Sequence, residues 1–352
     1  MKNYVYSFGG GRADGDGTMK EVLGGKGSGL AEMSRAGIPV PPGFTISTEV
    51  CNIYFQNGNK VPDEINQQAL KALDKLEAQI GKKLGDPNDP LLVSVRSGAK
   101  FSMPGMMNTI LNLGLNDKSV EGLATLTNNP RFAYDSYRRF ILSYADLVLA
   151  LDTQPFDECL RAAPEVHGAP DWQTITAQYL RIFEREAGTP FPQDVQRQLW
   201  AAISAVLESW ESRRARMYRA LHGVPDQPGI AVSIQAMVFG NAGPSSGTGV
   251  GFSRNPTTGA PQPFGEYLAN AQGGDVVSGV ATPHSIARDG SQASLQEAMP
   301  DVYDALLTSF RTLERHFGTV QDVEFTVERG KLWLLQARPA VLSAAASVRV
   351  AV

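Results

Sequence analysis

Two carboxylates, an amide and a guanidinium lie close together near the C-terminal end of the chain. In DVEFTVE (322–328) polar residues alternate with Val and Phe, which predicts a strand with one polar face. In KLWLLQAR (331–338) the same alternation puts Leu332, Leu334, Gln336 and Arg338 on one face. Two carboxylates beside an amide oxygen are hard ligands of the kind that Mg²⁺ accepts, and a neighbouring arginine suits phosphate oxygens.

The register of a hairpin between these strands decides whether the polar side chains meet. A three-residue loop, 329–331, pairs Glu328 with Leu332. It thereby sets two pairs opposite each other, Glu324 with Gln336 and Asp322 with Arg338. A two-residue loop would shift every pair and send Gln336 to the other face. We predict the three-residue loop; the alternative for these residues is a solvated polar strand face.

A glycine-rich segment near the N-terminus carries a lysine. In GGKGSGLAEM (24–33) the glycines would let backbone N–H groups approach an anion, and a helix beginning near Ser28 would add its positive end. Lys26 supplies a mobile charge. The segment fails as a Walker A motif, because Lys20 and Gly27 stand where that motif needs glycine and Ser or Thr. The alternative is a tight turn with a solvated lysine.

An arginine ends a strand-like run, LLVSVR (91–96). Val93 and Val95 fall on one face and Ser94 and Arg96 on the other, so a rigid element would hold the planar guanidinium toward phosphate oxygens. The SMPGMM segment that follows (102–107) combines Gly, Pro and flexible Met, as a mobile lid would. The alternative is a salt-bridged arginine with Met filling the core.

A second glycine-rich segment, NAGPSSG (241–247), lies between strand-like runs at 230–239 and 248–253. We predict a hairpin here, whose amides could fold over phosphates; the alternative is an ordinary β-hairpin. The segment also fits G-x-S-x-G, but a nucleophile elbow needs a helix after the serine, and a strand-like run follows instead.

The elements that must position these residues form a mixed order. An amphipathic helix is predicted at 63–80, and the period is helical from 116 to 222, with one long helix opening at Pro192 and ending before Gly223. Mixed α/β segments flank this part. We therefore predict an α/β (α+β) fold: an N-terminal lobe at 1–115 completed by about 198–240, a helical subdomain at 116–197, a C-terminal lobe at 241–340 and a tail at 341–352.

Composition narrows the function classes. The net charge is −4, which disfavours a nucleic-acid surface, and no apolar run is long enough to span a membrane. The two cysteines fit no metal spacing, and the start of the chain has no secretory signal, so we expect a cytoplasmic protein. The chain as a whole supplies two glycine segments, a lysine, two arginines, two acids and an amide. This set is typical of nucleoside triphosphate binding with Mg²⁺ and phosphoryl transfer.

The sequence resembles the N-terminal nucleotide-binding region of the pyruvate, phosphate dikinase family. The resemblance rests on these segments: LGGKGSGLAEM, PPGFTIST, LLVSVRSGA, SMPGMMNTILNLGLND, FAYDSYRRFI, SGTGVGFSRNPTTG, GEYLANAQG and DVEFTVERGKLWLLQAR. It implies an ATP-grasp-like fold with an inserted helical subdomain, and it implies MgATP as the ligand.

The resemblance also implies roles for single residues. Lys26, Arg96 and Arg338 would be catalytic and contact phosphates, and Asp322, Glu324 and Gln336 would hold Mg²⁺ and the triphosphate. The remaining implied nucleotide contacts are the hinge residues Gln235, Met237 and Val238, the glycine loop Ser246, Gly247, Thr248 and Gly249, and Glu266.

Part of the family pattern is missing from this sequence. The family continues into a domain with a phosphorylated histidine in a T-S-H-A motif and a barrel that binds pyruvate or phosphoenolpyruvate, and neither occurs here. We expect phosphoryl transfer from ATP to a histidine on that separate domain, towards phosphoenolpyruvate synthesis. The alternatives are a related phosphotransferase, such as phosphoenolpyruvate synthase, and a non-catalytic ATP-binding module.

Overall fold

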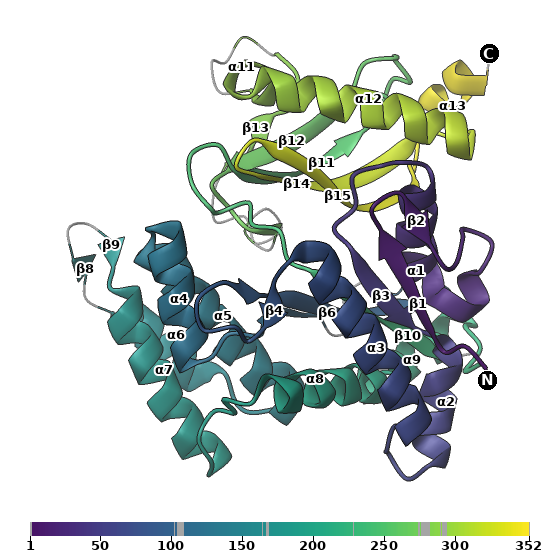
Figure 1. Cartoon of the computed structure of the whole chain (residues 1–352). Helices are drawn as coiled ribbons and strands as arrows, with labels where there is room; N and C mark the ends of the chain where they lie inside the picture. The colour runs from purple at the N-terminus through teal and green to yellow at the C-terminus, as the bar shows by residue number, and fades with distance from the viewer. Residues whose placement is uncertain are drawn as a thin grey trace. The chain divides into compact units, whose positions relative to one another are not determined.

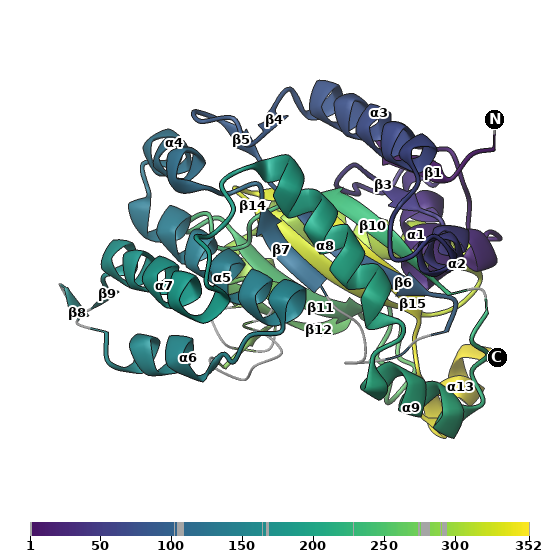
Figure 2. The same ribbon diagram turned by 90° about the horizontal axis from the view of Figure 1, so that it is seen from below.

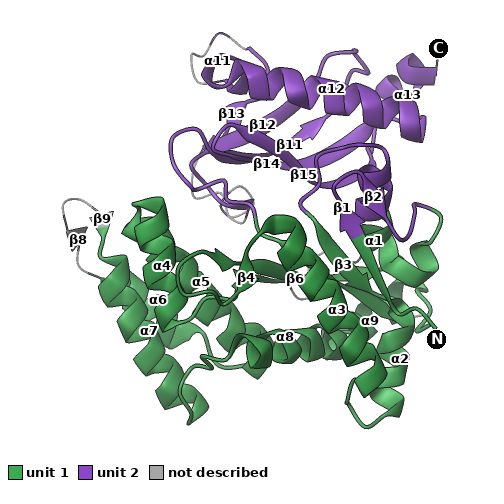
Figure 3. Ribbon diagram, viewed as in Figure 1, with its two compact units in different colours: residues 1–7, 18–28, 42–237 green, residues 8–17, 29–41, 238–352 purple. Residues whose placement is uncertain are grey.

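The structure is a computed structural model that describes residues 2–101, 103, 109–163, 165–166, 169–227, 229–273, 275, 282–288, 290 and 294–351. Helices and antiparallel sheets alternate along the chain, so the predicted mixed α/β class is confirmed (Figure 1). Two compact units are built from interleaved segments (Figure 3). Unit 1 comprises 1–7, 18–28 and 42–237, and unit 2 comprises 8–17, 29–41 and 238–352.

A six-stranded sheet has the order β2-β1-β3-β10-β6-β7. Its strands are β1 (Val5–Gly9), β2 (Arg12–Ala13), β3 (Gly43–Ile46), β6 (Val93–Ala99), β7 (Thr109–Leu113) and β10 (Ile230–Ala236). One face carries apolar residues that are fully buried, among them Val95 and Ile234. That face packs against α2 (Thr48–Gln56), α3 (Asp63–Ile80) and α8 (Val195–Ser209); Figure 2 shows α8 lying along the sheet. The amphipathic helix predicted at 63–80 is therefore confirmed as α3.

A helical layer flanks the edge strand β7 within unit 1. It contains α4 (Asp117–Thr127), α5 (Pro130–Leu149), α6 (Gln154–Arg161) and α7 (Trp172–Ala187). α5 packs on β7 and on its neighbours α4, α7 and α8. Edge-on aromatic contacts around Phe191 help to close this layer. Two small sheets, β4 (Lys83–Leu84) with β5 (Pro90–Leu91) and β8 (Glu165–Val166) with β9 (Ala169–Pro170), complete the unit.

The single long helix predicted from Pro192 to Gly223 is wrong, because two helices occupy this region. α8 begins after Asp194, whose carboxylate accepts hydrogen bonds from the first-turn amides, and α9 spans Arg213–His222. Ser212 caps α9 by accepting from the Ala215 amide at 3.2 Å. A capping residue such as Ser212 starts a new helix even where apolar residues continue at helical spacing.

A five-stranded antiparallel sheet of order β13-β12-β11-β14-β15 forms unit 2. Its strands are β11 (Gly247–Phe252), β12 (Phe264–Ala269), β13 (His284–Ser285), β14 (Gln321–Glu328) and β15 (Lys331–Pro339). α12 (Pro300–Phe317) covers one face and contributes Leu306, Phe310 and Leu313 to the core (Figure 1). Phe8, Leu30 and Met33 from the N-terminal segments join the same core.

Three further helices complete the described chain: α1 (Lys20–Arg35), α11 (Leu295–Ala298) and α13 (Ala344–Ala351). α1 belongs to both units, since the boundary falls between Ser28 and Gly29. Within the described residues, no helix has the length and apolar character needed to cross a membrane.

Candidate functional site

One face of the five-stranded sheet gathers the predicted metal-binding residues. Glu324 lies opposite Gln336 and Asp322 lies opposite Arg338, so both predicted pairs are confirmed. The row continues across the sheet, because Val250 pairs with Glu324 on one side and with Glu266 on the other. Residues directly opposite each other share a face, so Glu266, Glu324 and Gln336 all project from the same side of unit 2.

The three-residue turn predicted between β14 and β15 is wrong. Glu328 pairs with Lys331, so Arg329 and Gly330 alone form the turn, and both have positive φ (49° and 78°). This is the backbone that a two-residue hairpin turn favours. The expected pairs survive because the register shifts between Glu324 and Phe325, where Leu335 is an extra residue on β15.

Because of this β-bulge, the face predicted for Leu332 and Leu334 is wrong. Leu332 and Leu334 are 5 % and 0 % exposed and pack in the core with Val323 and Phe325. They therefore lie on the opposite face from Gln336 and Arg338. A bulge interrupts the alternation by one residue, so the side chains beyond it change faces. The bulge brings the polar residues of β15 onto the face of Glu324.

Asp322 and Arg338 form an ion pair across the strands. Arg338 Nε donates to Asp322 Oδ2 at 2.7 Å, and the Arg338 side chain is 54 % exposed while that of Asp322 is 14 % exposed. The described residues include no group of three or more His, Cys, Asp or Glu that would hold an ion by themselves. Two carboxylates with an amide oxygen nevertheless fit Mg²⁺, which proteins commonly bind through one or two carboxylates together with substrate phosphates.

The predicted hairpin around NAGPSSG is wrong. Strand β10 belongs to the six-stranded sheet, whereas β11 pairs with β12 and β14 in the five-stranded sheet. Gly247, Thr248 and Gly249 are thus the first three residues of the central strand β11, and their proposed contact with phosphates stays a prediction. A Cβ on Gly249 would lie 2.4 Å from the Glu266 carbonyl oxygen, so close packing is one reason for glycine there.

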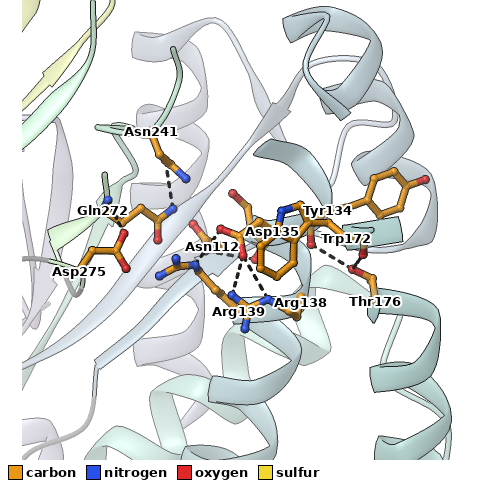
Figure 4. Close-up of polar contacts among 11 residues, drawn as sticks. Asn112, Tyr134, Asp135, Arg138, Arg139, Trp172, Thr176, Asn241, Gln272 and Asp275 are labelled. Carbon is orange, nitrogen blue, oxygen red and sulfur yellow. Dashed lines mark hydrogen bonds and ion pairs between the residues drawn. The ribbon is translucent and has the colours of Figure 1, made fainter. Parts of the chain in front are cut away.

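Ser246 has a local role that the sequence did not suggest. Its hydroxyl is fully buried and accepts from the Arg329 amide at 3.0 Å, and its neighbour Ser245 accepts from the Gly330 amide at 2.7 Å. These bonds attach the glycine-rich segment to the β14–β15 turn. At the start of the segment, the side-chain Nε2 of Gln272 donates to Asn241 Oδ1 at 3.3 Å. The backbone N–H of Gln272 donates to Asp275 Oδ2 (Figure 4).

Arg96 projects from the polar face of the six-stranded sheet. Val93 and Val95 are fully buried on the other face, which confirms the predicted alternation. Arg96 lies between Ser233 on β10 and Thr109 on β7, and Thr45 on β3 lies beyond Ser233. Sequence analysis missed these hydroxyl residues; the period-two pattern of each strand was the signal that could have found them.

Lys26 lies in α1 just after a break in the helix. Two helical stretches meet at Gly24, whose backbone angles are non-helical (φ 65°, ψ 173°). The predicted helix therefore begins directly after Gly24 rather than near Ser28, and the predicted glycine loop shrinks to this one residue. A Cβ on Gly24 would lie 2.0 Å from the Gly98 carbonyl oxygen. Gly98 lies two positions after Arg96, so Lys26 and Arg96 come from elements that touch on one face of unit 1.

The predicted hinge residues lie where the chain leaves unit 1. Gln235 is 2 % exposed, the Met237 amide donates to the Leu92 carbonyl at 2.8 Å, and the unit boundary falls between Met237 and Val238. Their contact with adenine stays a prediction. The predicted lid at 102–107 lies outside the described residues apart from Met103.

Comparison with known proteins defines the class. The family model for the pyruvate phosphate dikinase AMP/ATP-binding domain matches residues 20–74, 58–301 and 300–351. The chain is 47 % identical over 366 residues to pyruvate, phosphate dikinase of Rhizobium meliloti and 47 % identical over 360 residues to that of Clostridium symbiosum. It is 46 % identical to the chloroplastic enzyme of Flaveria pringlei.

The alignments with these three proteins cover the whole of this chain and 41 %, 40 % and 37 % of the relatives. The chain thus spans about two fifths of the length of the proteins it matches, and it corresponds to their N-terminal part. It belongs to the family of AMP/ATP-binding domains of pyruvate, phosphate dikinases.

Proposed function

We propose that this chain binds MgATP and passes phosphoryl from ATP to a histidine on a separate domain, within the pyruvate, phosphate dikinase reaction. That reaction would couple ATP, phosphate and pyruvate to AMP, pyrophosphate and phosphoenolpyruvate. The observation that carries the proposal is the row of Glu266, Glu324 and Gln336 beside the Asp322–Arg338 pair on one sheet face. The family match over nearly the whole chain supports it.

The proposed roles follow from charge and from the elements that carry it. Lys26 on a helix and Arg96 on a strand of unit 1 would bind phosphate oxygens of ATP, and the polar face of unit 2 would bind Mg²⁺ and phosphate. When bound, Mg²⁺ would neutralise phosphate charge, and Glu324, Gln336 and Asp322 would hold it. Arg338 would leave Asp322 in part and donate to a phosphate, since a planar guanidinium forms paired hydrogen bonds with such oxygens.

An ATP-grasp-like arrangement is part of this proposal. It is supported by a sheet in each unit with one apolar and one polar face, and by the chain crossing between the units next to Gln235–Val238. Backbone groups of 235–238 would face adenine, and Gly247–Gly249 would lie along the phosphates. The histidine domain and the pyruvate-binding barrel would be the partners.

Calorimetry with MgATP on this chain tests binding. Glu324→Gln is expected to weaken binding at least tenfold, whereas Glu328→Gln, at the turn end of the same strand face, is expected to leave it unchanged. The same titration in EDTA should lose most of the affinity. Equal binding by wild type and Glu324→Gln would contradict the proposed metal site.

Labelled ATP then tests transfer. With a family histidine domain and inorganic phosphate added in trans, ATP labelled in its β-phosphate is expected to leave the label on the histidine. AMP is then the leaving group, and inorganic phosphate takes up the γ-phosphoryl group as pyrophosphate. Binding without any transfer would instead support a non-catalytic ATP-binding module. Transfer with no use of inorganic phosphate would favour a synthase-type relative.

A further inference from the structure

Asn112 has an unusual backbone conformation for a strand residue. It lies inside β7, it is fully buried, and its φ is +60°. Left-handed backbone is unfavourable for most L-residues, and asparagine is among the few side chains that tolerate it. A buried residue held in such a conformation indicates that the surrounding structure requires it.

The conformation of Asn112 accompanies a change of register between β6 and β7. Val93 pairs with Leu113, but Val95 pairs with Ile110 and Arg96 with Thr109, so β7 holds one extra residue. The bulge lets Leu113 and Ile110 both face the apolar side, where each is fully buried. It also puts Thr109 on the face of Arg96.

The side chain of Asn112 attaches this edge strand to the helical layer. Its Nδ2 donates to the Ser136 carbonyl of α5 at 3.2 Å, in a buried setting (Figure 4). Among the described strands, β7 pairs with β6 alone, so the register of β7 has no support from a second described strand. The amide bond to α5 supplies a second point of attachment.

The acceptor lies in a rigid part of α5. Next to Ser136, the buried Asp135 carboxylate accepts from Arg138 and from Arg139 Nε, the latter at 2.9 Å (Figure 4). The Arg138 guanidinium lies 4.8 Å from the centroid of the Trp172 ring on α7. Ion pairs and ring stacking hold this turn of α5, so the Ser136 carbonyl is a fixed point for Asn112.

We propose that Asn112 is a positioning residue for Arg96. Its left-handed backbone sets the bulge, and its amide bond to α5 holds β7 in the register that puts Thr109 beside Arg96. This inference rests on the proposed function, because it assigns the effect of Asn112 to phosphate binding by Arg96. Asn112 does not contact the ligand in this proposal.

Asn112→Gly separates the side-chain tether from the backbone requirement. Glycine adopts positive φ without strain, and the change also removes Asn112 Oδ1, a buried oxygen with no hydrogen-bond partner in the described structure. The variant is therefore expected to fold with a Tm close to that of wild type. MgATP affinity is expected to fall about tenfold, and amides of 109–113 should exchange with solvent faster.

Ser136→Ala is the matched control. It keeps the backbone carbonyl that accepts from Asn112 and removes only a buried hydroxyl, so affinity and exchange at 109–113 should match wild type. Asn112→Ala restores the strain and should lower both Tm and affinity. In the double variant with Arg96→Ala, Asn112→Gly should cause no further loss of affinity, because Asn112 would act through Arg96.

The outcomes distinguish this inference from the proposed function. If wild type fails to bind MgATP, the proposed function fails and the inference with it. If wild type binds and Asn112→Gly binds equally well, or if its loss adds in full to that of Arg96→Ala, Asn112 is structural and only the inference is overturned.

Discussion

The two sheets place polar side chains on one face by different backbone devices. In each, the edge strand contains a bulge: β15 at Leu335 and β7 next to Asn112. In β15 the bulge moves Gln336 and Arg338 onto the face of Glu324 without any positive φ. In β7 it needs a left-handed asparagine attached to a helix. A bulge shifts the alternation of side chains between the two faces by one residue. An edge strand can thus carry core residues on one side of the bulge and site residues on the other.

Deleting Ala337 should have the largest effect. The strand beyond Gln336 would then shift by one residue and put the charged Arg338 opposite Val323 on the core face, so the free energy of unfolding should fall by at least ~3 kcal/mol and MgATP binding should be lost. Urea denaturation and calorimetry measure both. Deleting Leu335 instead removes only the extra residue of the bulge, leaves Gln336 opposite Glu324 and should retain binding. An Ala337 deletion variant that binds normally would show that the end of the strand absorbs the change.

Removing the guanidinium from the other sheet should affect chemistry more than folding. Arg96→Ala is expected to slow phosphoryl transfer to a supplied histidine domain by about 10²–10³, the usual effect of losing one group that stabilises developing charge. Lys26→Ala should behave alike. Circular dichroism and Tm should stay close to wild type. Transfer at the wild-type rate would remove both residues from the mechanism.

The break in α1 should be sensitive to a single methyl group. Gly24→Ala adds a Cβ that would lie 2.0 Å from a backbone oxygen, in addition to a φ of +65°, so we expect a loss of roughly 2–3 kcal/mol of stability and weaker nucleotide binding. Gly37→Ala is the control: its φ is +76° but no atom lies within 4 Å. Equal losses in the two variants would show that strain alone, without the close contact, explains the effect.

Alkaline pH should weaken unit 1 slightly. Burial raises the pKa of Cys51, in α2, from 9.0 to about 11. The neutral thiol is therefore favoured in the folded state, and its contribution is fully present below pH 9 and is lost as pH rises toward 11. The loss is at most about 1.4 kcal/mol per pH unit. Urea denaturation at pH 8 and 10 should show a smaller decline for Cys51→Ala than for wild type, with Cys159→Ala as control; identical declines would contradict this.

Regular strands could be predicted from the sequence, and irregular ones could not. The alternation in 322–328 and in 93–96 was correct because no residue interrupts those strands. The residue types in KLWLLQAR do not indicate that Leu335 is the extra residue, because the bulge depends on how β15 pairs with β14. The turn length was wrong for the same reason, although both errors left Glu324 opposite Gln336.

The glycine-rich segments show a second limit of sequence analysis. GGKGSG was predicted as a loop whose glycines let backbone N–H groups approach an anion, yet residues 25–29 are helical directly after the break at Gly24. Tertiary contacts explain the difference: a Cβ on Gly27 would lie 2.9 Å from the Thr45 side chain, so α1 needs glycine to lie against the sheet. Such contacts involve residues far apart in sequence, and composition alone does not reveal them.

The interleaving of the two units has a consequence during synthesis on the ribosome. Phe8, Leu30 and Met33 leave the ribosome early, but Phe310, Val323 and Leu334, which complete their core, follow roughly 300 positions later. The hydrogen bond from the Leu334 backbone amide to the Pro39 carbonyl likewise forms only after Leu334 has been synthesised. Unit 2 therefore reaches its final packing only when translation of this region is nearly complete, and until then its early apolar segments lack the later residues that bury them.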